Sequence, residues 1–444
     1  MKKIALALIA SIVILGLSST ADAGLFGGKK GKTKTPTHGN RIPILLSESG
    51  AEPDPNLATV PVVMPEAVVN PNWAQPGGSA SKANGHLALA PSISAVWHKS
   101  ITGNTNSERL GAAPVVADGK LFVIDIHAHV HAMNAQTGAD LWTADFGDKK
   151  GKNVLYGGGV SVEDGVVYAT NGIGDVGALK VADGSLIWKK RPGGPLRGAP
   201  SIGNGNIYVT SQDNQLFALK AADGNIEWSS SASLEVAGVF GAASPAIGQG
   251  TVVQGFSSGE LNAYRYENGR SLWGDALSRT SMSTSVAALS DIDADPVIDR
   301  GRVFAIGAGG RMVSVDLVTG QRIWEINIAG LATPWVAGEW VFAVTDDAKL
   351  HCIARATGKI RWTLLLPHFV KNKADKAVIR WYGPVLAGGR LILTSTEGQI
   401  ANVNPGDGSL NAMGRGSGPT SFGPIVANNM LYTLDNAGHL TAWR

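Results

Sequence analysis

A repeated unit fills most of the chain and limits the folds that it can adopt. In four copies a Pro begins the unit, a Gly follows five residues later, and a Trp ends it 28 residues after the Pro. These copies begin at Pro114, Pro200, Pro245 and Pro296. Repeated units of this size bury their apolar residues by packing against neighbouring copies. The sequence therefore favours one architecture built from repeats.

The remaining copies depart from the pattern at single positions. They are Val160 to Trp188, with Val in place of Pro; Pro334 to Trp362, with Gly338 one residue early; and Pro384 to Ala412, with Ala in place of Trp. An eighth copy begins at Pro424, has Asn429 in the Gly position, and reaches Arg444 before a closing strand. The sequence thus holds seven complete units and the start of an eighth.

Each unit reads as a series of short antiparallel strands. In the copy that begins at Pro200, apolar or alternating runs cover 206–210, 215–219 and 225–228. Turn residues such as Asp213-Asn214 and Asp223-Gly224 separate these runs. Three or four short strands in each unit, with a period of roughly 40 to 50 residues, are typical of β-propeller blades.

The two ends of the repeat region can complete the eighth unit together. A short apolar segment, 93–97, precedes the first full copy, and its Trp97 matches the Trp that closes the other units. An open stack of repeats would leave two exposed sheet edges, whereas a ring closed by this segment leaves no long unpaired edge. We therefore predict an all-β, eight-bladed β-propeller over residues 73–444, closed by an N-terminal strand and preceded by an extended N-terminal tail.

The first 72 residues read as a leader and a tail. Lys2 and Lys3 precede an apolar run of 4–17, and Ala21-Asp22-Ala23 offers a cleavage site, so residues 1–23 are predicted to be a secretory signal peptide. Residues 24–72 are rich in Gly, Lys and Pro and show no sustained period, which predicts a flexible tether. Two apolar pieces within it, 42–46 and 60–64, are candidates for docking on a partner or on the folded domain.

Charge and cysteine content exclude some classes of function. The net charge is +3, and five basic residues lie together in the tail, so the repeat region is close to neutral and nucleic acid is not an expected partner. In an exported protein disulfides are allowed, but a chain with Cys352 alone cannot form an intramolecular one. Cys352 occupies a position where other units have Ala, so it is predicted to be buried and inert.

Other polar motifs give weaker signals. His127, His129 and His131 alternate along one predicted strand, and a metal site there is conceivable, although the spacing indicates no fourth ligand. The glycines at 157–159 and 307–310 lack a strand-to-helix context, so they read as turns rather than phosphate-binding loops. No pair of nucleophile and base stands out.

An acidic segment directly precedes the unit that begins at Pro296. Asp291, Asp293 and Asp295 resemble the start of a calcium loop, but Pro296 and Arg302 stand where such a loop needs Gly and Glu. One interpretation is a solvated turn. The other is a contact for a partner, because the repeat itself does not require these carboxylates.

The acidic segment, LSDIDADPV at 289–297, and the unit behind it resemble the BamB family, assembly factor B of the outer-membrane β-barrel assembly machinery. The resemblance covers about 97–444, and NWAQPGG at 72–78 is similar to the form of this family found in alphaproteobacteria. It implies a non-enzymatic propeller without a cofactor that binds BamA and other subunits of the machinery. Its implied role is to help fold and insert nascent outer-membrane proteins.

The resemblance also implies site residues. Two loops on one face of the family's propeller contact BamA, and the carboxylates of one loop correspond to Asp291 and Asp293. Leu234 and Val236 correspond to the apolar positions of the other loop, while Ala237 replaces an Arg. Many family members are lipoproteins, but no Cys stands at 15–19. The chain is therefore expected in the periplasm at the inner face of the outer membrane, which it would contact through its partners.

Two other functions remain open at this level. The repeat, with ADGNIEW at 222–228 as one instance, is also similar to that of pyrroloquinoline-quinone (PQQ)-dependent dehydrogenases. A chain with one cysteine lacks the vicinal cysteine pair that many of those enzymes carry beside the quinone. A propeller that serves as the scaffold of another envelope complex is the third possibility.

Overall fold

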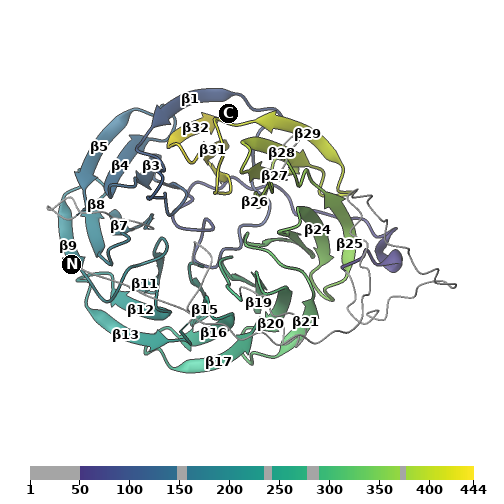
Figure 1. The fold of residues 1–444 in the computed structure, drawn as a ribbon, viewed down its shortest axis with the longest axis horizontal. Coiled ribbons are helices and arrows are strands. Elements are labelled where there is room, and N and C mark those ends of the chain that lie inside the picture. Colours follow the sequence, from purple (N-terminus) through teal and green to yellow (C-terminus); the bar gives the residue numbers. More distant parts are fainter. Residues whose placement is uncertain (1–50, 148–157, 235–242, 278–289, 371–376) are drawn as a thin grey trace, which may run out of the picture. The chain divides into compact units, whose positions relative to one another are not determined.

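A computed structural model describes residues 51–147, 158–234, 243–277, 290–370 and 377–444. These residues form eight four-stranded sheets and one short 3₁₀ helix, η1 (Pro55–Leu57). The sheets follow one another around a ring as the blades of a β-propeller (Figure 1). The predicted all-β, eight-bladed fold is confirmed. The predicted signal peptide lies outside the described residues.

Each blade runs from an inner strand at the centre of the ring to an outer strand at its rim. The innermost strands are β2 (Val115–Ala117), β6 (Val160–Glu163), β10 (Ser201–Gly203), β14 (Ala246–Gly248), β18 (Val297–Asp299), β22 (Trp335–Ala337), β26 (Trp381–Ala387) and β30 (Ile425–Ala427). The second strands are β3 (Lys120–Ile124), β7 (Val166–Thr170), β11 (Asn206–Thr210), β15 (Thr251–Gly255), β19 (Arg302–Gly307), β23 (Trp340–Val344), β27 (Arg390–Ser395) and β31 (Met430–Leu434).

The third strands are β4 (His129–Asn134), β8 (Val176–Lys180), β12 (Gln215–Lys220), β16 (Glu260–Arg265), β20 (Arg311–Asp316), β24 (Lys349–Ala354), β28 (Gln399–Val403) and β32 (His439–Trp443). The outer strands are β5 (Asp140–Asp145), β9 (Leu186–Lys190), β13 (Ile226–Ser231), β17 (Ser271–Ala276), β21 (Arg322–Ile326), β25 (Ile360–Leu365), β29 (Leu410–Arg415) and β1 (Ala95–Ser100). Neighbouring strands within each blade are antiparallel. We number the blades 1 to 8, beginning with the blade of β2.

The ring closes as the sequence predicts. β1 pairs with β32 in blade 8, with Trp97 opposite Ala442 and Ser100 opposite His439. The N-terminal strand therefore completes the blade that the C-terminus begins. This closure leaves the last unit with no unpaired outer edge.

A Trp on each of seven outer strands locks its blade to the next one. The indole Nε1 donates a hydrogen bond to a backbone carbonyl of the following blade, in the pairs Trp97–Ala135, Trp142–Val181, Trp188–Ala221, Trp228–Tyr266, Trp273–Leu317, Trp324–Arg355 and Trp362–Pro405. The ring of each Trp covers the Gly in the last turn of that next blade. The predicted role of the Trp, packing between blades, is confirmed.

This lock explains why blade 7 has Ala412 instead of Trp. Blade 8 takes its third strand from the C-terminus and its outer strand from the N-terminal part of the chain. No turn joins β32 to β1, so there is no turn Gly for a Trp of blade 7 to cover. The one missing Trp thus follows from the way that the ring closes.

Residues 51–90, the N-terminal strap, lie along the ring and then inside it (Figure 1). In seven blades the described strap forms a hydrogen bond with the third residue of the unit. The pairs are Asn70–Val426, Trp73–Val116, Ala74–Val162, Gln75–Ile202, Ala80–Ile247, Ser81–Ile298 and Leu87–Leu386. In blade 6 the indole of Trp335 donates to the carbonyl of Gly85 at 2.7 Å. The strap thereby contacts every blade.

The strap changes one expectation from the sequence. Residues 51–72 were assigned to a flexible tether, but the backbone N–H of Asp54 donates to Ile360, and its carboxylate pairs with Lys359 at 2.7 Å. Val62 and Met64, in the apolar piece 60–64, pack against the largest hydrophobic core. This part of the tail is extended as expected but docked, because the blades supply hydrogen-bond partners for its backbone. The remainder, 24–50, lies outside the described residues.

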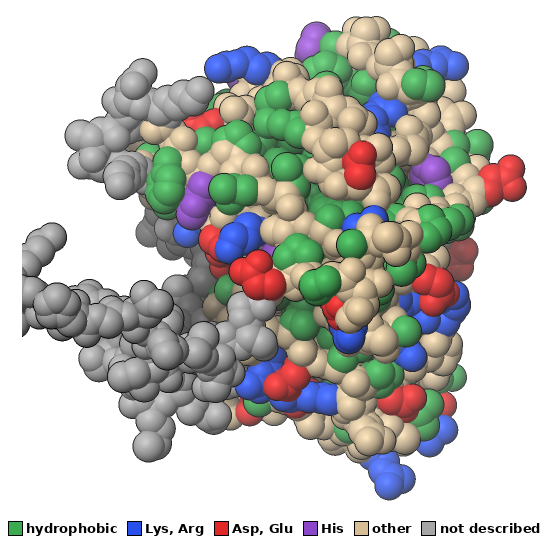
Figure 2. Space-filling view, turned by 90° about the vertical axis from the view of Figure 1, so that its right-hand side faces the viewer, with side chains coloured by type: hydrophobic (Ala, Val, Ile, Leu, Met, Phe, Trp, Pro, Cys, Tyr) green, Lys and Arg blue, Asp and Glu red, His purple; other side chains and the backbone are tan. Residues whose placement is uncertain are grey.

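The side of the ring shown in Figure 2 carries charges of both signs among hydrophobic side chains, without a broad field of one sign. Within the described ranges, none of the helices has the length and apolar character needed to cross a membrane.

Candidate binding site on the connection face of the propeller

One end of the ring carries the connections between consecutive blades. Because the strands alternate in direction, the connections from each outer strand to the next inner strand emerge at the same end as the turns between second and third strands. We call this end the connection face. Leu234 follows β13, and Asp291 and Asp293 precede β18, so these predicted site residues all lie on connections at this face. Val236 lies outside the described residues.

The acidic segment 291–295 is held in place by the buried apolar side chains that alternate with its carboxylates. Ile292 and Ala294 are both 1% exposed and belong to the hydrophobic clusters on either side of blade 5. The backbone N–H of Ile292 donates to Phe256, and the carbonyl of Asp291 accepts from Ala308 at 2.9 Å. A Cβ on Gly255 would lie 2.4 Å from Ile292, so a glycine is needed there. The segment is therefore rigidly seated rather than a solvated turn.

The three carboxylates of this segment have different surroundings. Asp291 is 1% exposed, and its Oδ2 lies 3.9 Å from the guanidinium of Arg197. Asp293 and Asp295 are half-buried and line the central cavity of the ring. Asp291 thus holds the segment in place, while the other two present their side chains to the channel.

Leu234 projects from a clamped position. Its side chain is 74% exposed. The preceding residue, Ser233, donates through its N–H and its hydroxyl to the carboxylate of Glu260, at 3.1 and 2.8 Å. The carbonyl of Ser233 accepts from the amide of Asn214 at 2.7 Å. These bonds hold the root of the loop so that the leucine points to solvent.

A chain of hydrogen bonds joins the Leu234 loop to the acidic segment. The buried Asn214 also accepts from the hydroxyl of Ser257 at 2.7 Å. The carbonyl of Ser257 in turn accepts from the hydroxyl of Ser290 at 3.2 Å, directly before Asp291. The sequence analysis interpreted Asn214 as a turn residue only. Asn214 lies in the turn between the second and third strands of blade 3, and Ser257 lies in the same turn of blade 4. This correspondence between repeats was the signal that could have indicated a contact between them.

The centre of the ring contains a cavity of about 880 Å³. Strap residues Trp73, Pro76, Gly77 and Lys82 line it from inside the ring, and inner strands and the connections between blades line the rest. The indole of Trp73 stacks on Trp335, with ring centroids 6.2 Å apart. The strap contacts the inner strands near the face opposite the connections, so its residues bound the cavity on that side.

The cavity contains ionisable groups whose pKa values are shifted. Burial lowers the pKa of Lys82 to about 8, and the nearby charge of Asp295 opposes that change. Burial raises the pKa of Asp293 to about 8, helped by the negative charge of Asp291 and opposed by Arg197. The pKa of Asp295 is also raised by burial. Lys82 lies between the predicted tether and the first full repeat, so no position of the repeat pointed to it.

The three histidines that the sequence suggested as conceivable metal ligands have other roles in the structure. β4 begins at His129, so His127 belongs to the turn before it. His129 and His131 both contact the carboxylate of the buried Asp125, at 3.2 and 3.1 Å. Burial tends to raise the pKa of Asp125, but hydrogen bonds from His131 and from the His129 backbone hold it below its usual value. In the described part of the chain, no cluster of His, Cys, Asp or Glu has the arrangement of a metal site.

Cys352 is fully buried, as predicted, and burial raises the pKa of its thiol. A buried thiol with a raised pKa is a poor nucleophile.

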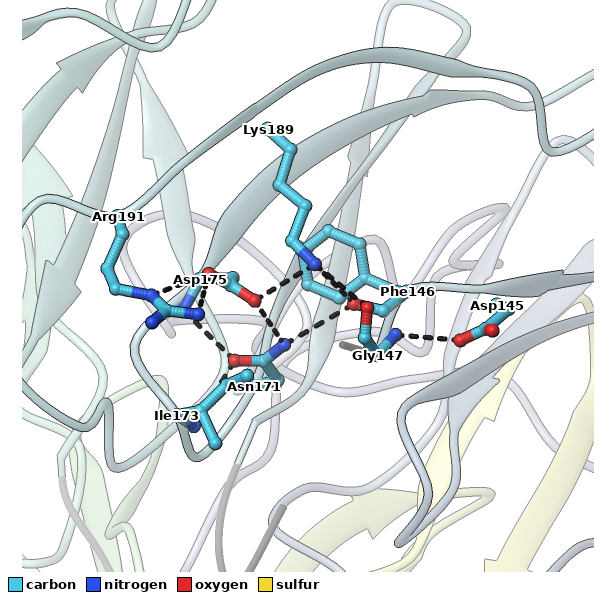
Figure 3. A network of polar contacts seen from close by, with 8 residues as sticks. All are labelled: Asp145, Phe146, Gly147, Asn171, Ile173, Asp175, Lys189 and Arg191. Carbon is cyan, nitrogen blue, oxygen red and sulfur yellow. Dashed lines mark hydrogen bonds and ion pairs between the residues drawn. The ribbon is translucent and has the colours of Figure 1, made fainter. Parts of the chain in front are cut away.

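A second polar network holds Phe146 and Gly147, where the connection from blade 1 to blade 2 begins (Figure 3). The buried Asp175 pairs with Lys189 at 2.9 Å and with Arg191 at 2.7 Å, and it accepts from Asn171. The ammonium of Lys189 also donates to the carbonyls of Phe146 and Gly147. Several connections on this face are thus anchored at their roots by buried polar side chains.

Comparisons with known proteins agree with one family. The family model described as "Outer membrane protein assembly factor BamB" matches residues 88–155 and 126–364. The chain is 31% identical over 321 residues to the protein of that name from Salmonella typhimurium, covering 71% of this chain and 80% of the relative. It is 32% identical over 320 residues to that from Escherichia coli K12, covering 71% and 79%.

Solved structures show the same fold. The crystal structure of BamB from Moraxella catarrhalis superposes with a TM-score of 0.66 at 17% identity, covering 80% of this chain and 100% of that one. The quinohemoprotein alcohol dehydrogenase from Comamonas testosteroni has a TM-score of 0.66 at 13% identity, covering 85% and 81%. At such identities the likeness concerns the propeller alone.

Proposed function

The chain belongs to the family of outer membrane protein assembly factor BamB, and from this membership we propose that it is a non-enzymatic scaffold subunit of the outer-membrane β-barrel assembly machinery. In this role it binds BamA and other subunits, and it assists the folding and insertion of nascent outer-membrane proteins.

The observation that carries the proposal is the link between the two loops on the connection face. Leu234 is exposed on a clamped root, and hydrogen bonds through Asn214 and Ser257 connect that root to the acidic segment. An exposed apolar residue on one loop and carboxylates on the other, with both loops held by one rigid frame, suit a protein partner. Leu234 and Val236 supply the apolar part, Asp293 the charge, and Asp291 keeps the segment in position.

The proposed location is the periplasmic side of the outer membrane. A signal peptide at 1–23 would export the chain, and the segment 15–19 has no Cys that could be acylated. Attachment would then depend on partners. Mass spectrometry of the mature N-terminus should show a chain that begins at Gly24. An acylated N-terminus would contradict the proposal that the protein is attached to the membrane only through its partners.

Co-purification with BamA from solubilised envelopes tests the proposed contact. Leu234→Asp should reduce the recovered BamA by about ten-fold or more, as expected for a central contact residue. Val318→Asp is the matched control, since Val318 is 76% exposed and lies in a turn at the opposite face.

Asp293→Lys tests the acidic side of the same contact. We expect weaker recovery of BamA, and a thermal unfolding scan should verify that the variant is folded. Full recovery with both Leu234→Asp and Asp293→Lys would refute the proposed site.

A further inference from the structure

The central cavity has two unlike walls. One wall is apolar and consists of Leu110, Trp335, Val385 and Phe422, which come from blades 1, 6, 7 and 8 or the connections that lead to them. The other wall carries Asp293 and Asp295, on the connection between blades 4 and 5. A ligand that fits this space has an apolar body and a polar end.

On the wall with the carboxylates, one oxygen atom has no hydrogen-bond donor among the described residues. Asp295 Oδ1 accepts from the backbone N–H of Ser244 at 2.6 Å. In contrast, Asp293 Oδ1 is buried and accepts no hydrogen bond from the part of the chain that the structure describes. Asp291 and Asp346 place further negative charge near Asp293. A buried acceptor without a donor is unfavourable, so a ligand that donates a hydrogen bond to Asp293 Oδ1 is favoured.

The cations around the cavity have other contacts or lie at its rim. Lys82 donates to the carbonyl of Pro76 at 2.7 Å and to the hydroxyl of Ser201 at 3.0 Å. Arg109 donates to the carbonyl of Thr105 at 2.7 Å. Arg380 is exposed at the rim; burial raises the pKa of Asp346 and of Tyr382, and the positive charge of Arg380 opposes that change. It forms no ion pair within 4 Å with a carboxylate of the described residues. Burial and the negative charge of Asp291 raise the pKa of Asp293, with Arg197 opposing the change, so a cationic ligand would bind the ionised carboxylate in exchange for its proton.

We propose that the cavity binds the side chain of an Arg or Lys residue from an extended polypeptide, with its cationic head at Asp293 and its aliphatic stem along Trp335 and Phe422. Aromatic faces and a carboxylate together are a suitable environment for a guanidinium or ammonium group. The strap closes the floor, so the chain enters from the connection face. This binding shares Asp293 with the proposed contact with BamA, but a titration of the isolated chain measures it in the absence of BamA, so the two proposals can fail separately.

The full mature chain can be titrated with blocked pentapeptides while the fluorescence of its tryptophans is recorded. The probe is Ala-Ala-Arg-Ala-Ala, and the matched uncharged probe has citrulline in place of Arg. We expect saturable binding of the Arg peptide and at least ten-fold weaker binding of the citrulline peptide. A peptide with Glu at the centre that binds as well as the Arg peptide would overturn the proposal.

Two variants and one small molecule locate the binding. Asp293→Asn keeps the shape of the side chain and should weaken the Arg peptide at least ten-fold, whereas Asp118→Asn, in an exposed turn at the opposite face, should leave it unchanged. Equal affinity in Asp293→Asn would contradict the site. Agmatine carries the same guanidinium without a peptide backbone. We expect it to bind more weakly than the peptide, and tighter binding of agmatine would show that the cavity takes a small organic cation instead.

Discussion

The indole of Trp97 covers Gly138 at the junction where the ring closes. Its Nε1 donates to the carbonyl of Ala135 at 3.0 Å, and a Cβ added to Gly138 would lie 2.8 Å from the indole ring. Gly138 also has a φ of +71°, which an L residue rarely adopts. A glycine is therefore needed at position 138 for two reasons: the turn requires a positive φ, and the indole of Trp97 leaves no room for a side chain.

Gly138→Ala should destabilise the protein through both effects. The left-handed backbone costs about 1 kcal/mol for Ala, and the clash with Trp97 adds about 1–3 kcal/mol. Gly119→Ala is the control, because Gly119 has the same φ of +71° and a Cβ added there meets nothing within 4 Å. Urea unfolding should show a larger loss for Gly138→Ala, and equal losses would mean that the indole does not restrict this position.

The fold was predictable because the repeat encodes it locally. Pro, Gly and Trp mark each blade, and the predicted strands at 206–210 and 215–219 correspond to β11 and β12. The docking of the strap could not be predicted in this way. Its residues follow no period, and their hydrogen-bond partners exist only when all eight inner strands surround them.

The candidate site was predictable in part. The sequence placed Leu234 and the acidic segment on loops, and the structure places both on the connection face. The burial of Asp291 and the bridge through Asn214 depend on contacts between residues far apart in the chain. Spacing within one unit contains no information about such contacts, so the sequence did not reveal them.

Trp73→Ala tests how much the strap stabilises the ring. Trp73 is buried, stacks on Trp335 and exchanges two backbone hydrogen bonds with Val116. Loss of a buried Trp side chain costs about 3–5 kcal/mol. Val63→Ala, at an exposed position of the same strap, should change the free energy of unfolding by less than about 0.5 kcal/mol. Similar small effects of both substitutions would show that the strap contributes little.

Asn214→Gly tests the bridge between the two loops. The substitution keeps the positive φ of 58° but removes the amide that bonds Ser233 and Ser257. We expect a loss of about 1–3 kcal/mol and weaker recovery of BamA, although no proposed contact residue is changed. Asn204→Gly is the control, since Asn204 has a φ of 57° and is exposed. Unaltered recovery of BamA by a folded Asn214→Gly variant would exclude a positioning role.

Asp293 makes the stability of the protein depend on pH. Burial and the negative charge of Asp291 raise its pKa to about 8 in the folded state, whereas an unfolded Asp titrates near 3.8. Between these values the folded state binds more protons, so the stability contributed by this group falls as pH rises from about 4 to about 8. Asn cannot ionise and resembles the protonated carboxyl. The stability of Asp293→Asn relative to the unmodified protein should therefore increase between pH 5 and pH 8, as measured by urea unfolding. Asp118→Asn should show no such trend, and a constant difference for Asp293→Asn would mean that Asp293 titrates normally.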